Sequence, residues 1–405
     1  MLDSGADTMI RAGGGRSVLY LQFTDPAGYP PLEYSARILR NCGWNVRFLG
    51  ICWYGSQRMS FGADLDEFVG LLNAPSRGWR QKLFYLRYTI SAVKSALMER
   101  PDWVYVSDSM ATPAGWLLKT LGFRVIYHEH DSPGTEAGTM LIRIVAWFRR
   151  SMARKADLNI LPQEERIQLF RDDTGTRRPI HCVWNCPIVA DVARVPRAAR
   201  KPNFPLGVYF HGSLNLDRVP LTLIEGAKLS GVPVRFRVVG YETVGSVGTC
   251  ERLREVAREA GTKVTLELPG AFSRHELAAQ MDSMHVGWMA YRCSSEDINL
   301  THLVGASNKA FDYLAAGMPL LVRATPDWRK IFVVPGFARE CDTNDPDSIA
   351  AALRWFYEHP METAEMGARG QENISVKWNY EEQFRPTFDL MSLSYSDSVA
   401  RQTGN

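Results

Sequence analysis

Hydrophobic runs and amphipathic stretches alternate along the first half of the chain. Short apolar runs with β-branched and aromatic residues occur at SVLYLQF (17–23), NVRFLGI (45–51), WVYVSD (103–108), FRVIYHEH (123–130) and LNILP (158–162). Between them lie segments with helical spacing of apolar residues, such as LEYSARILRNCG, which ends at Gly43. Short apolar runs are typical of strands buried on both faces, and the intervening helices predict right-handed crossovers in a parallel sheet.

The alternation is interrupted once and then resumes. The interruption, residues 191–205, is rich in Arg and Pro and poor in apolar residues, which is typical of a linker. Strands are then predicted at LGVYFHG, RFRVVG, KVTLELPG, HVGWMAY and PLLVRA, and the tetrad SRHE (273–276) has the form of a helix capping box. The pattern predicts an α/β protein with two doubly wound, parallel-sheet domains and ligands in the crevice between them, outside the carboxyl ends of the strands.

Length and composition agree with two cores and exclude several classes of protein. The chain has 405 residues, of which 45% are hydrophobic, and its formal net charge of +3 argues against a nucleic-acid partner. Its seven cysteines include no CxxC pair, so neither a disulfide framework nor a structural zinc site is indicated. No apolar run approaches the roughly 20 residues that cross a bilayer. We therefore expect a cytoplasmic protein with a flexible leader at 1–16.

One segment near position 308 has the features of an anion-binding helix start. Ser307 and Asn308 are both good N-caps for the helix in ASNKAFDYLAAGMPLLV, so its first amides and the positive end of its macrodipole should point outward. Lys309 adds a positive charge beside these amides, which suits a diphosphate that leaves as a product. Asp312 lies about one turn further on, where a carboxylate could accept hydrogen bonds from the hydroxyls of a ribose.

This segment resembles the donor-binding helix of retaining GT-B glycosyltransferases of the glycosyltransferase family 4 type (group 1). The resemblance implies two Rossmann-like domains with an interdomain cleft: an acceptor-side domain at 17–190, the linker at 191–205 and a nucleotide-sugar-binding domain at 206–379. A C-terminal helix and tail at 380–405 should return toward the first domain. In the family's E-x7-E pattern, Asp312 matches the second acid, which holds the ribose, but Val304 occupies the place of the first. The sugar would then meet Glu296 or Asp297, or the backbone at 305–306.

A second stretch, YFHGSLNLDR, resembles the family's first strand of the donor domain. Gly212 would let the backbone approach the diphosphate, and Arg218 aligns with a basic residue that binds it, whereas Ser213 replaces the other basic residue. The resemblance further implies that loop contacts around Gly240 recognise the base.

A third resemblance lies at the strand end VIYHEHDSPG. By strand alternation His128 and His130 share one face, and Glu129 and Asp131 the other. His130 is similar to the family's histidine that reaches the transferred sugar, with Asp131 behind it. Two other interpretations of these residues are a metal site and polar groups that are satisfied at a strand end. The family resemblance implies no metal and no other cofactor.

Two further features concern the acceptor. The loop PAGYPP, with Gly28 and Tyr29, stands where the family's N-terminal loop approaches donor and acceptor. Two predicted helices are basic and aromatic and lack acids over the segments GWRQKLFYLRYTISAVK and LIRIVAWFRRSMARK. Their basic residues are Arg77, Arg80, Lys82, Arg87 and Lys94 in one, and Arg143, Arg149, Arg150, Arg154 and Lys155 in the other. Such helices suit an anionic membrane surface, and two solvated helix faces are the competing interpretation.

The resemblance implies transfer of a hexose from a nucleoside diphosphate sugar to a hydroxyl acceptor with retention of configuration, in the synthesis of a surface glycan or glycolipid. Lys309 and Arg218 would stabilise the departing phosphate, Asp312 would hold the ribose and His130 would position the sugar. If the basic helices bind the inner face of a membrane, the acceptor is lipid-linked or a growing glycan. The alternatives are a nucleotide-sugar epimerase of the same fold and a non-catalytic nucleotide-sugar binding protein, the latter suggested by Val304.

Overall fold

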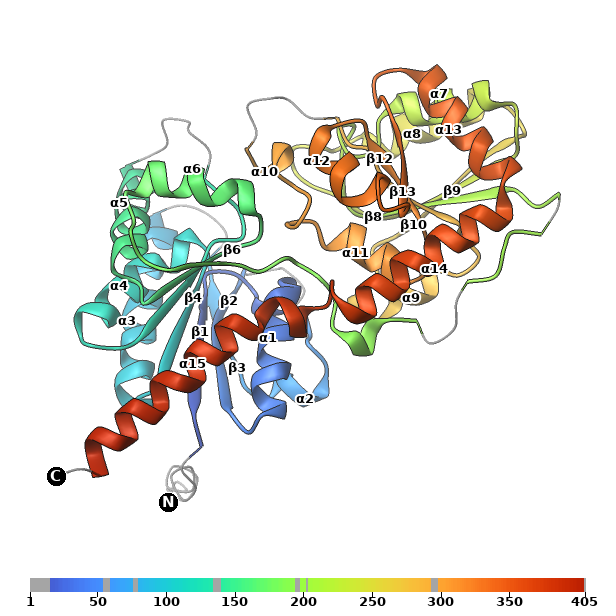
Figure 1. Ribbon diagram of the computed structural model, residues 1–405. Helices are drawn as coiled ribbons and strands as arrows, with labels where there is room; N and C mark the ends of the chain where they lie inside the picture. The colour runs from blue at the N-terminus through green and yellow to red at the C-terminus, as the bar shows by residue number, and fades with distance from the viewer. Residues whose placement is uncertain are drawn as a thin grey trace. The chain divides into compact units, whose positions relative to one another are not determined.

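The computed structural model describes residues 15–53, 59–75, 79–133, 140–193, 197–201, 203–292 and 298–403. The chain divides into two compact units, one containing the residues up to Val183 and those from Gln383 onward, the other running from Trp184 to Glu382. Each unit is built on its own parallel β-sheet (Figure 1). The two parallel-sheet α/β domains predicted from the alternation of strands and helices are confirmed.

The sheet of the first unit has the order β3-β2-β1-β4-β5-β6-β7, with all neighbours parallel. Its strands are β1 (Ser17–Gln22), β2 (Asn45–Trp53), β3 (Val69–Ala74), β4 (Trp103–Ser107), β5 (Val125–His128), β6 (Leu158–Leu161) and β7 (Ile180–Cys182). Its helices are α1 (Pro30–Asn41), α2 (Ala63–Asp66), α3 (Trp79–Glu99), α4 (Thr112–Thr120), α5 (Met140–Lys155), α6 (Glu164–Thr174) and, from Gln383 on, α15 (Tyr380–Thr403). Short 3-10 turns precede α1 and α4, η1 (Pro26–Gly28) and η2 (Ser109–Ala111).

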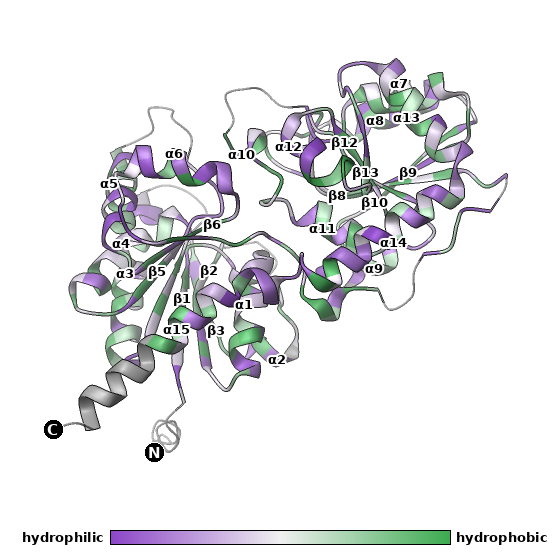
Figure 2. Ribbon diagram, viewed as in Figure 1, coloured by the Kyte–Doolittle hydropathy of each residue, from purple (hydrophilic) through white to green (hydrophobic). Residues whose placement is uncertain are grey.

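Helices cover both faces of this sheet. On one face, residues such as Leu21 and Val106 pack against α3, α4 and α5 in a single apolar core. On the other face, Tyr20 stacks between Phe48 and Tyr105, and the indole of Trp103 donates to the carbonyl of Met391 in α15 (3.2 Å). The central strands are therefore buried on both sides, which explains their predominantly hydrophobic colour in Figure 2.

The sheet of the second unit has the order β10-β9-β8-β11-β12-β13, again parallel. Its strands are β8 (Leu206–Leu214), β9 (Val234–Glu242), β10 (Val264–Gly270), β11 (Val286–Met289), β12 (Leu320–Arg323) and β13 (Ala338–Cys341). Its helices are α7 (Leu221–Ser230), α8 (Thr249–Glu259), α9 (Arg274–Met281), α10 (Ile298–Thr301), α11 (Asn308–Ala315), α12 (Pro326–Trp328), α13 (Pro346–Glu358) and α14 (Pro360–Val376). The predicted capping box at Ser273 and Glu276 is formed. Among the described helices of the chain, none is long and apolar enough to cross a bilayer.

The sequence pattern did not predict three edge strands. β3 and β7 are the outer strands of the first sheet, and β13 is an outer strand of the second. Each is partly exposed along its length, whereas the neighbouring inner strands are buried. An edge strand pairs on one side only and does not require a continuous apolar run, so its signal is weak.

The boundary between the units differs from the one that the sequence suggested at residue 190. The second unit begins earlier because Trp184 packs against Phe311 and Trp378, each at 5.8 Å between ring centroids. Asn185 adds two hydrogen bonds of 2.8 Å, from its amide N–H to the carbonyl of Gly305 and from its side chain to that of Ala306. These contacts join residues distant in sequence, so composition alone did not reveal them.

Candidate functional site

Two glycines at the carboxyl ends of β8 and β9 bring these strands and a lysine into close approach. Gly212 pairs with Gly240 across the strands, and both have positive φ, +129° and +153°. A Cβ on Gly240 would lie 1.8 Å from the carbonyl oxygen of Gly212, and a Cβ on Gly212 would lie 2.5 Å from Cε of Lys309. Only glycine fits at either position. The side chain of Lys309 therefore lies directly over the end of β8.

The start of α11 supplies further polar groups at this edge of the sheet. Ser307 occupies the N-cap position, as predicted, but its side chain makes no capping hydrogen bond. Within the described part of the chain, its hydroxyl and the Oδ1 atom of Asn308 are buried without a hydrogen-bond partner, and Ser307 is only 4% exposed. Buried polar atoms normally have partners, and a helix start presents unsatisfied amides together with a partial positive charge. The first turn of α11 is thus suited to bind an anion.

Asp312 is held by two residues that the sequence analysis did not single out. Arg274, the first residue of α9, donates from both terminal nitrogens to the carboxylate, at 2.8 and 3.3 Å, and Nε2 of His211 lies 3.4 Å away. Burial by itself would raise the pKa of Asp312, but Arg274 and His211 outweigh it and hold the pKa well below its usual range. Burial also lowers the pKa of His211, which favours a neutral ring. Asp312 is therefore a permanently charged, oriented acceptor.

Arg274 and His211 both lie in stretches that the sequence analysis noted, but for other reasons. Arg274 belongs to the SRHE capping box, which marks a helix start without indicating a partner. His211 precedes Gly212 on β8, in the stretch noted only for its glycine and its basic residue.

Arg218 and Ser213 meet at the same end of β8. The guanidinium of Arg218 hydrogen bonds to the hydroxyl of Ser213 and approaches its carbonyl oxygen (3.4 Å). The backbone around Arg218 is fixed because its N–H donates to Oδ1 of Asn215 and its carbonyl accepts from the indole of Trp288, both at 2.8 Å. Arg218 therefore lies beside Ser213, the serine that replaces the earlier of the two basic residues in the family pattern.

Val304, at the place of the family's first acid, is fully buried and cannot contact a ligand. The two acids proposed in its stead, Glu296 and Asp297, lie outside the described residues. The backbone alternative, residues 305–306, is anchored through both carbonyl groups by Asn185.

The first unit gathers a second polar cluster at the carboxyl ends of β1, β4 and β5. Ser107 bonds to Nε2 of His130 (3.0 Å), and the backbone N–H of His130 donates to Oδ1 of Asp108 (3.3 Å). The ring of Tyr29 lies 5.3 Å from that of His130. The structure thus brings Tyr29 and His130 together and adds Asp108, which the sequence analysis missed.

Asp108 combines backbone strain with a perturbed pKa. Its φ of 66° and ψ of 162° lie in a region that is essentially restricted to glycine and costs of order 1–3 kcal/mol. Burial raises the pKa of Asp108 to about 6, although Gln22 and the His130 amide bond to the charged form. Burial also lowers the pKa of His130 to about 4, so its ring is neutral at pH 7. Strain and shifted pKa values are typical of functional sites.

The other residues considered at this strand end have different environments. His128 is fully buried behind His130, with ring centroids 3.9 Å apart as strand alternation predicted, and its Nδ1 bonds to the hydroxyl of Tyr105 (2.7 Å). Glu129 faces the other way and pairs with Arg149, at 2.6 and 2.8 Å. Asp131 and Gly28 are exposed, so they remain accessible to a ligand. Within the described ranges, no group of three or more His, Cys, Asp or Glu side chains could hold a metal ion.

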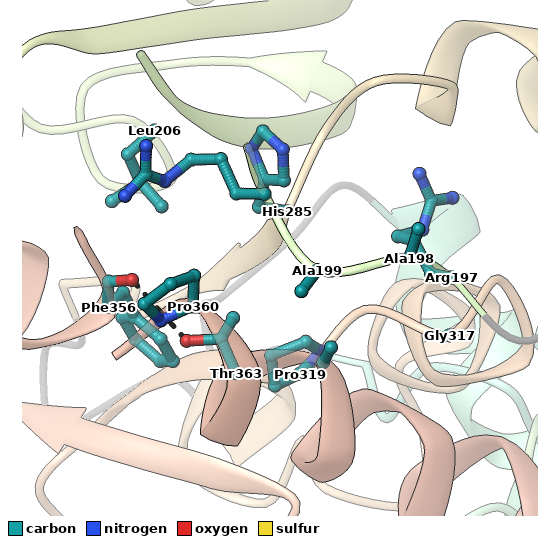
Figure 3. Close-up of a pocket in the computed structure, with 12 residues that line it drawn as sticks. Arg197, Ala198, Ala199, Leu206, His285, Gly317, Pro319, Phe356, Pro360 and Thr363 are labelled. Carbon is teal, nitrogen blue, oxygen red and sulfur yellow. Dashed lines mark hydrogen bonds between the residues drawn. The ribbon is translucent and has the colours of Figure 1, made fainter. Parts of the chain in front are cut away.

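A pocket in the second unit lies at the opposite, amino-terminal edge of its sheet. Figure 3 shows Arg197, Leu206, His285 and Pro319 around it, next to the starts of β8, β11 and β12. Arg197 donates to the carbonyl groups of Ala316, Met281 and Met284 at 2.9–3.0 Å. Arg197 thus attaches this part of the predicted linker to the second unit, which contains it.

Two family models match the sequence. Residues 32–186 match a glycosyl transferase 4-like domain, and residues 223–388 match a glycosyl transferase-like domain. No curated protein matches the sequence at a significant level.

Solved structures resemble the whole chain at low identity. The structure of HepE from Anabaena in complex with UDP and glucose has a TM-score of 0.67 and 15% identity, covering 93% of this chain and 99% of its own. Sucrose-phosphate synthase from Thermosynechococcus elongatus has a TM-score of 0.68 and 15% identity, with coverage of 94% and 100%. The lipopolysaccharide outer core galactosyltransferase WaaB, in its apo form, has a TM-score of 0.62 and 13% identity, with coverage of 93% and 99%. At these identities the likeness concerns the fold.

Proposed function

The chain belongs to the glycosyltransferases of the GT-B fold, and we propose that it transfers a sugar from a UDP-sugar to a hydroxyl group of its acceptor. The observation that carries the donor assignment is the position of Lys309 over Gly212, beside the uncapped first turn of α11. The two phosphate groups of the donor would meet a lysine, helix amides and the guanidinium of Arg218. UDP is the first nucleotide to test because HepE was solved with UDP and glucose.

Asp312 would bind the ribose of the donor. A carboxylate offers about four acceptor positions, and Arg274 and His211 occupy up to three of them. The remaining capacity suits a ribose hydroxyl, and Arg274 acts as a positioning residue that keeps the carboxylate charged and oriented.

A double-mutant cycle tests this arrangement. Arg274→Gln should lower the free energy of unfolding by about 2 kcal/mol, because Asp312 stays buried with only His211 beside it. Adding Asp312→Asn should recover about 1 kcal/mol, since the uncompensated charge is removed. Urea denaturation measures both values. Asp312→Asn alone should also weaken UDP binding about ten-fold, and strictly additive stability effects would contradict the coupling.

The polar cluster of the first unit would hold the sugar and the acceptor. Ser107 occupies Nε2 of His130, so the neutral ring offers its other nitrogen, Nδ1, to a sugar hydroxyl group. By the family resemblance, transfer occurs with retention, and the leaving phosphate itself helps to deprotonate the acceptor. We further propose that no metal is required, since Lys309 and Arg218 supply positive charge for the leaving group. Activity that persists in EDTA would support transfer without a metal. A product that NMR shows to have the donor's anomeric configuration would support retention.

The experiment that tests the function measures donor binding and turnover together. UDP should raise the melting temperature of the purified chain, because a ligand present at 100 times its Kd stabilises the folded state by about 2.7 kcal/mol. UDP-sugars should then release UDP, slowly with water and faster with lipid or glycan acceptors from surface glycan synthesis. Epimerised UDP-sugar without UDP release would identify an epimerase, and binding without turnover would identify a sensor. If no nucleoside diphosphate shifts the melting temperature, the donor assignment is wrong.

A further inference from the structure

The outer side of α3 carries a stripe of large apolar side chains. Between 51% and 68% of each side chain is exposed in this set: Trp79, Leu83, Leu86, Ile90 and Leu97. Their spacing of three, four or seven residues places them on one side of the helix. The opposite side, with Phe84, Tyr88, Ala92 and Ala96, is buried in the core beneath. Most of the surface of the stripe is therefore left uncovered by the described part of its own unit.

The stripe is part of a wider apolar surface. α4 packs against both α3 and α5, on the same side of the sheet. α5 exposes Met140, Ile144 and Trp147, from 43% to 80%, and their spacing of four and three residues places them on one side of the helix. Leu117 of α4 is 37% exposed. Monomeric proteins rarely expose so many large apolar residues on neighbouring elements without a partner.

The charged residues on this surface have one sign. Arg80, Lys82, Arg87, Lys94 and Arg143 are exposed around the apolar side chains. α4 and α5 contain no acid, and the one acid of α3, Glu99, pairs with Arg47 at 3.3 Å. The surface is therefore both apolar and positively charged.

The structure also narrows the set of basic residues named from the sequence. Arg149 is buried in ion pairs with Glu129 and Asp173, so it is not part of the surface, and Arg150 pairs with Asp173 at its edge. The side chain of Lys155 lies over the ring of Trp116 (4.9 Å). Arg77 lies outside the described residues.

We propose that this α3–α5 surface docks on the anionic face of a lipid bilayer. Exposed apolar side chains would enter the headgroup region, and the surrounding arginines and lysines would contact lipid phosphates. A second copy of the chain is a poorer partner, because a two-fold interface would bring the same positive charges together.

The proposal also predicts from which side the acceptor reaches the first unit, and this consequence rests on the proposed function. α4 follows the strand end that carries Asp108, and both α4 and α5 contact η2, which begins directly after Asp108. A docked surface would present this edge of the first unit to the bilayer. An amphiphilic, lipid-linked acceptor could then reach the cluster without leaving the membrane.

Vesicle co-sedimentation of the full chain tests the proposal. We expect binding to phosphatidylcholine vesicles that contain phosphatidylglycerol, weaker binding at high salt, and little binding to phosphatidylcholine alone. The variant Leu83→Gln, Leu86→Gln, Ile90→Gln should lose at least about ten-fold in binding to the anionic vesicles. Arg80→Gln, Lys82→Gln, Arg87→Gln should lose a similar factor.

A matched control tests whether the loss of vesicle binding is specific to the α3–α5 surface or follows from the removal of any exposed apolar side chains. Leu229→Gln, Met361→Gln, Val376→Gln removes three exposed apolar side chains (51–72%) from the second unit and should bind vesicles as the wild type does. All variants should keep the melting-temperature shift with UDP, which shows that they are folded and that the donor site works independently of the membrane. Any of three results would overturn the proposal. These are no binding to the anionic vesicles, an equal loss of vesicle binding in the control variant, or a dimer in sedimentation velocity that the α3 variant abolishes.

Discussion

Replacement of Lys309 by alanine is expected to reduce kcat/KM for the donor by about 10²–10³-fold. The lysine lies over Gly212 at the end of β8, where its ammonium group can meet the charge that develops on the leaving diphosphate. That charge is larger in the transition state than in the bound donor, so kcat should fall more than KM rises. The free energy of unfolding should change by less than about 1 kcal/mol, because the side chain is partly exposed.

Steady-state kinetics with the preferred UDP-sugar and thermal denaturation check this prediction together. Lys228→Ala is the matched control, since Lys228 is an exposed lysine of the same unit near the end of α7, away from the carboxyl edge of the sheet. The control should retain wild-type kinetics. An Lys309→Ala enzyme with unchanged kcat would remove the residue from the mechanism.

Asp108→Gly is expected to stabilise the protein by about 1–2 kcal/mol at neutral pH while it lowers kcat/KM about 100-fold. Glycine adopts the observed backbone conformation without strain, which offsets the flexibility it adds to the unfolded chain. The activity falls because the carboxylate that accepts from the His130 amide and faces Tyr29 is lost. A stability gain joined to an activity loss would identify Asp108 as a residue strained for function. A destabilised glycine variant would contradict this.

Asp108→Asn separates the charge of the carboxylate from the strain of the backbone. The pKa of Asp108 is about 6 in the folded state, against roughly 3.9 in an unfolded chain, so the folded state holds more protons between these values. The contribution of the Asp108 carboxyl group to the stability of the wild type therefore falls as the pH rises from about 4 to about 6. The asparagine variant should be more stable than the wild type by about 1–2 kcal/mol above pH 6, and this advantage should vanish toward pH 4. Urea denaturation across this pH range checks the sign, and an advantage that grows toward acid pH would contradict it.

Local sequence patterns predicted the α/β class and the two sheets, and they singled out several residues that lie at the carboxyl edge of the second sheet. The alternation of apolar runs and helical spacing follows from burial of each element against its neighbours, so it is readable without coordinates. Ser307, Lys309 and Asp312 were singled out from their spacing around one predicted helix start, whereas Gly212 was singled out from the family resemblance of its stretch. Three of the edge strands, β3, β7 and β13, were not predicted because a strand paired on one side needs no continuous apolar run.

Contacts between distant segments decided the rest. Arg274 and Asp312 are 38 residues apart, and no local pattern pairs them. The strained backbone of Asp108 depends on the strands around it, and the boundary at Trp184 depends on packing against α11. The basic helices were visible in the sequence, but only the packed structure distinguishes the buried Arg149 from the exposed apolar stripe of α3. Burial, ion pairing and strain are properties of the assembled fold, whereas residue spacing is a property of the chain.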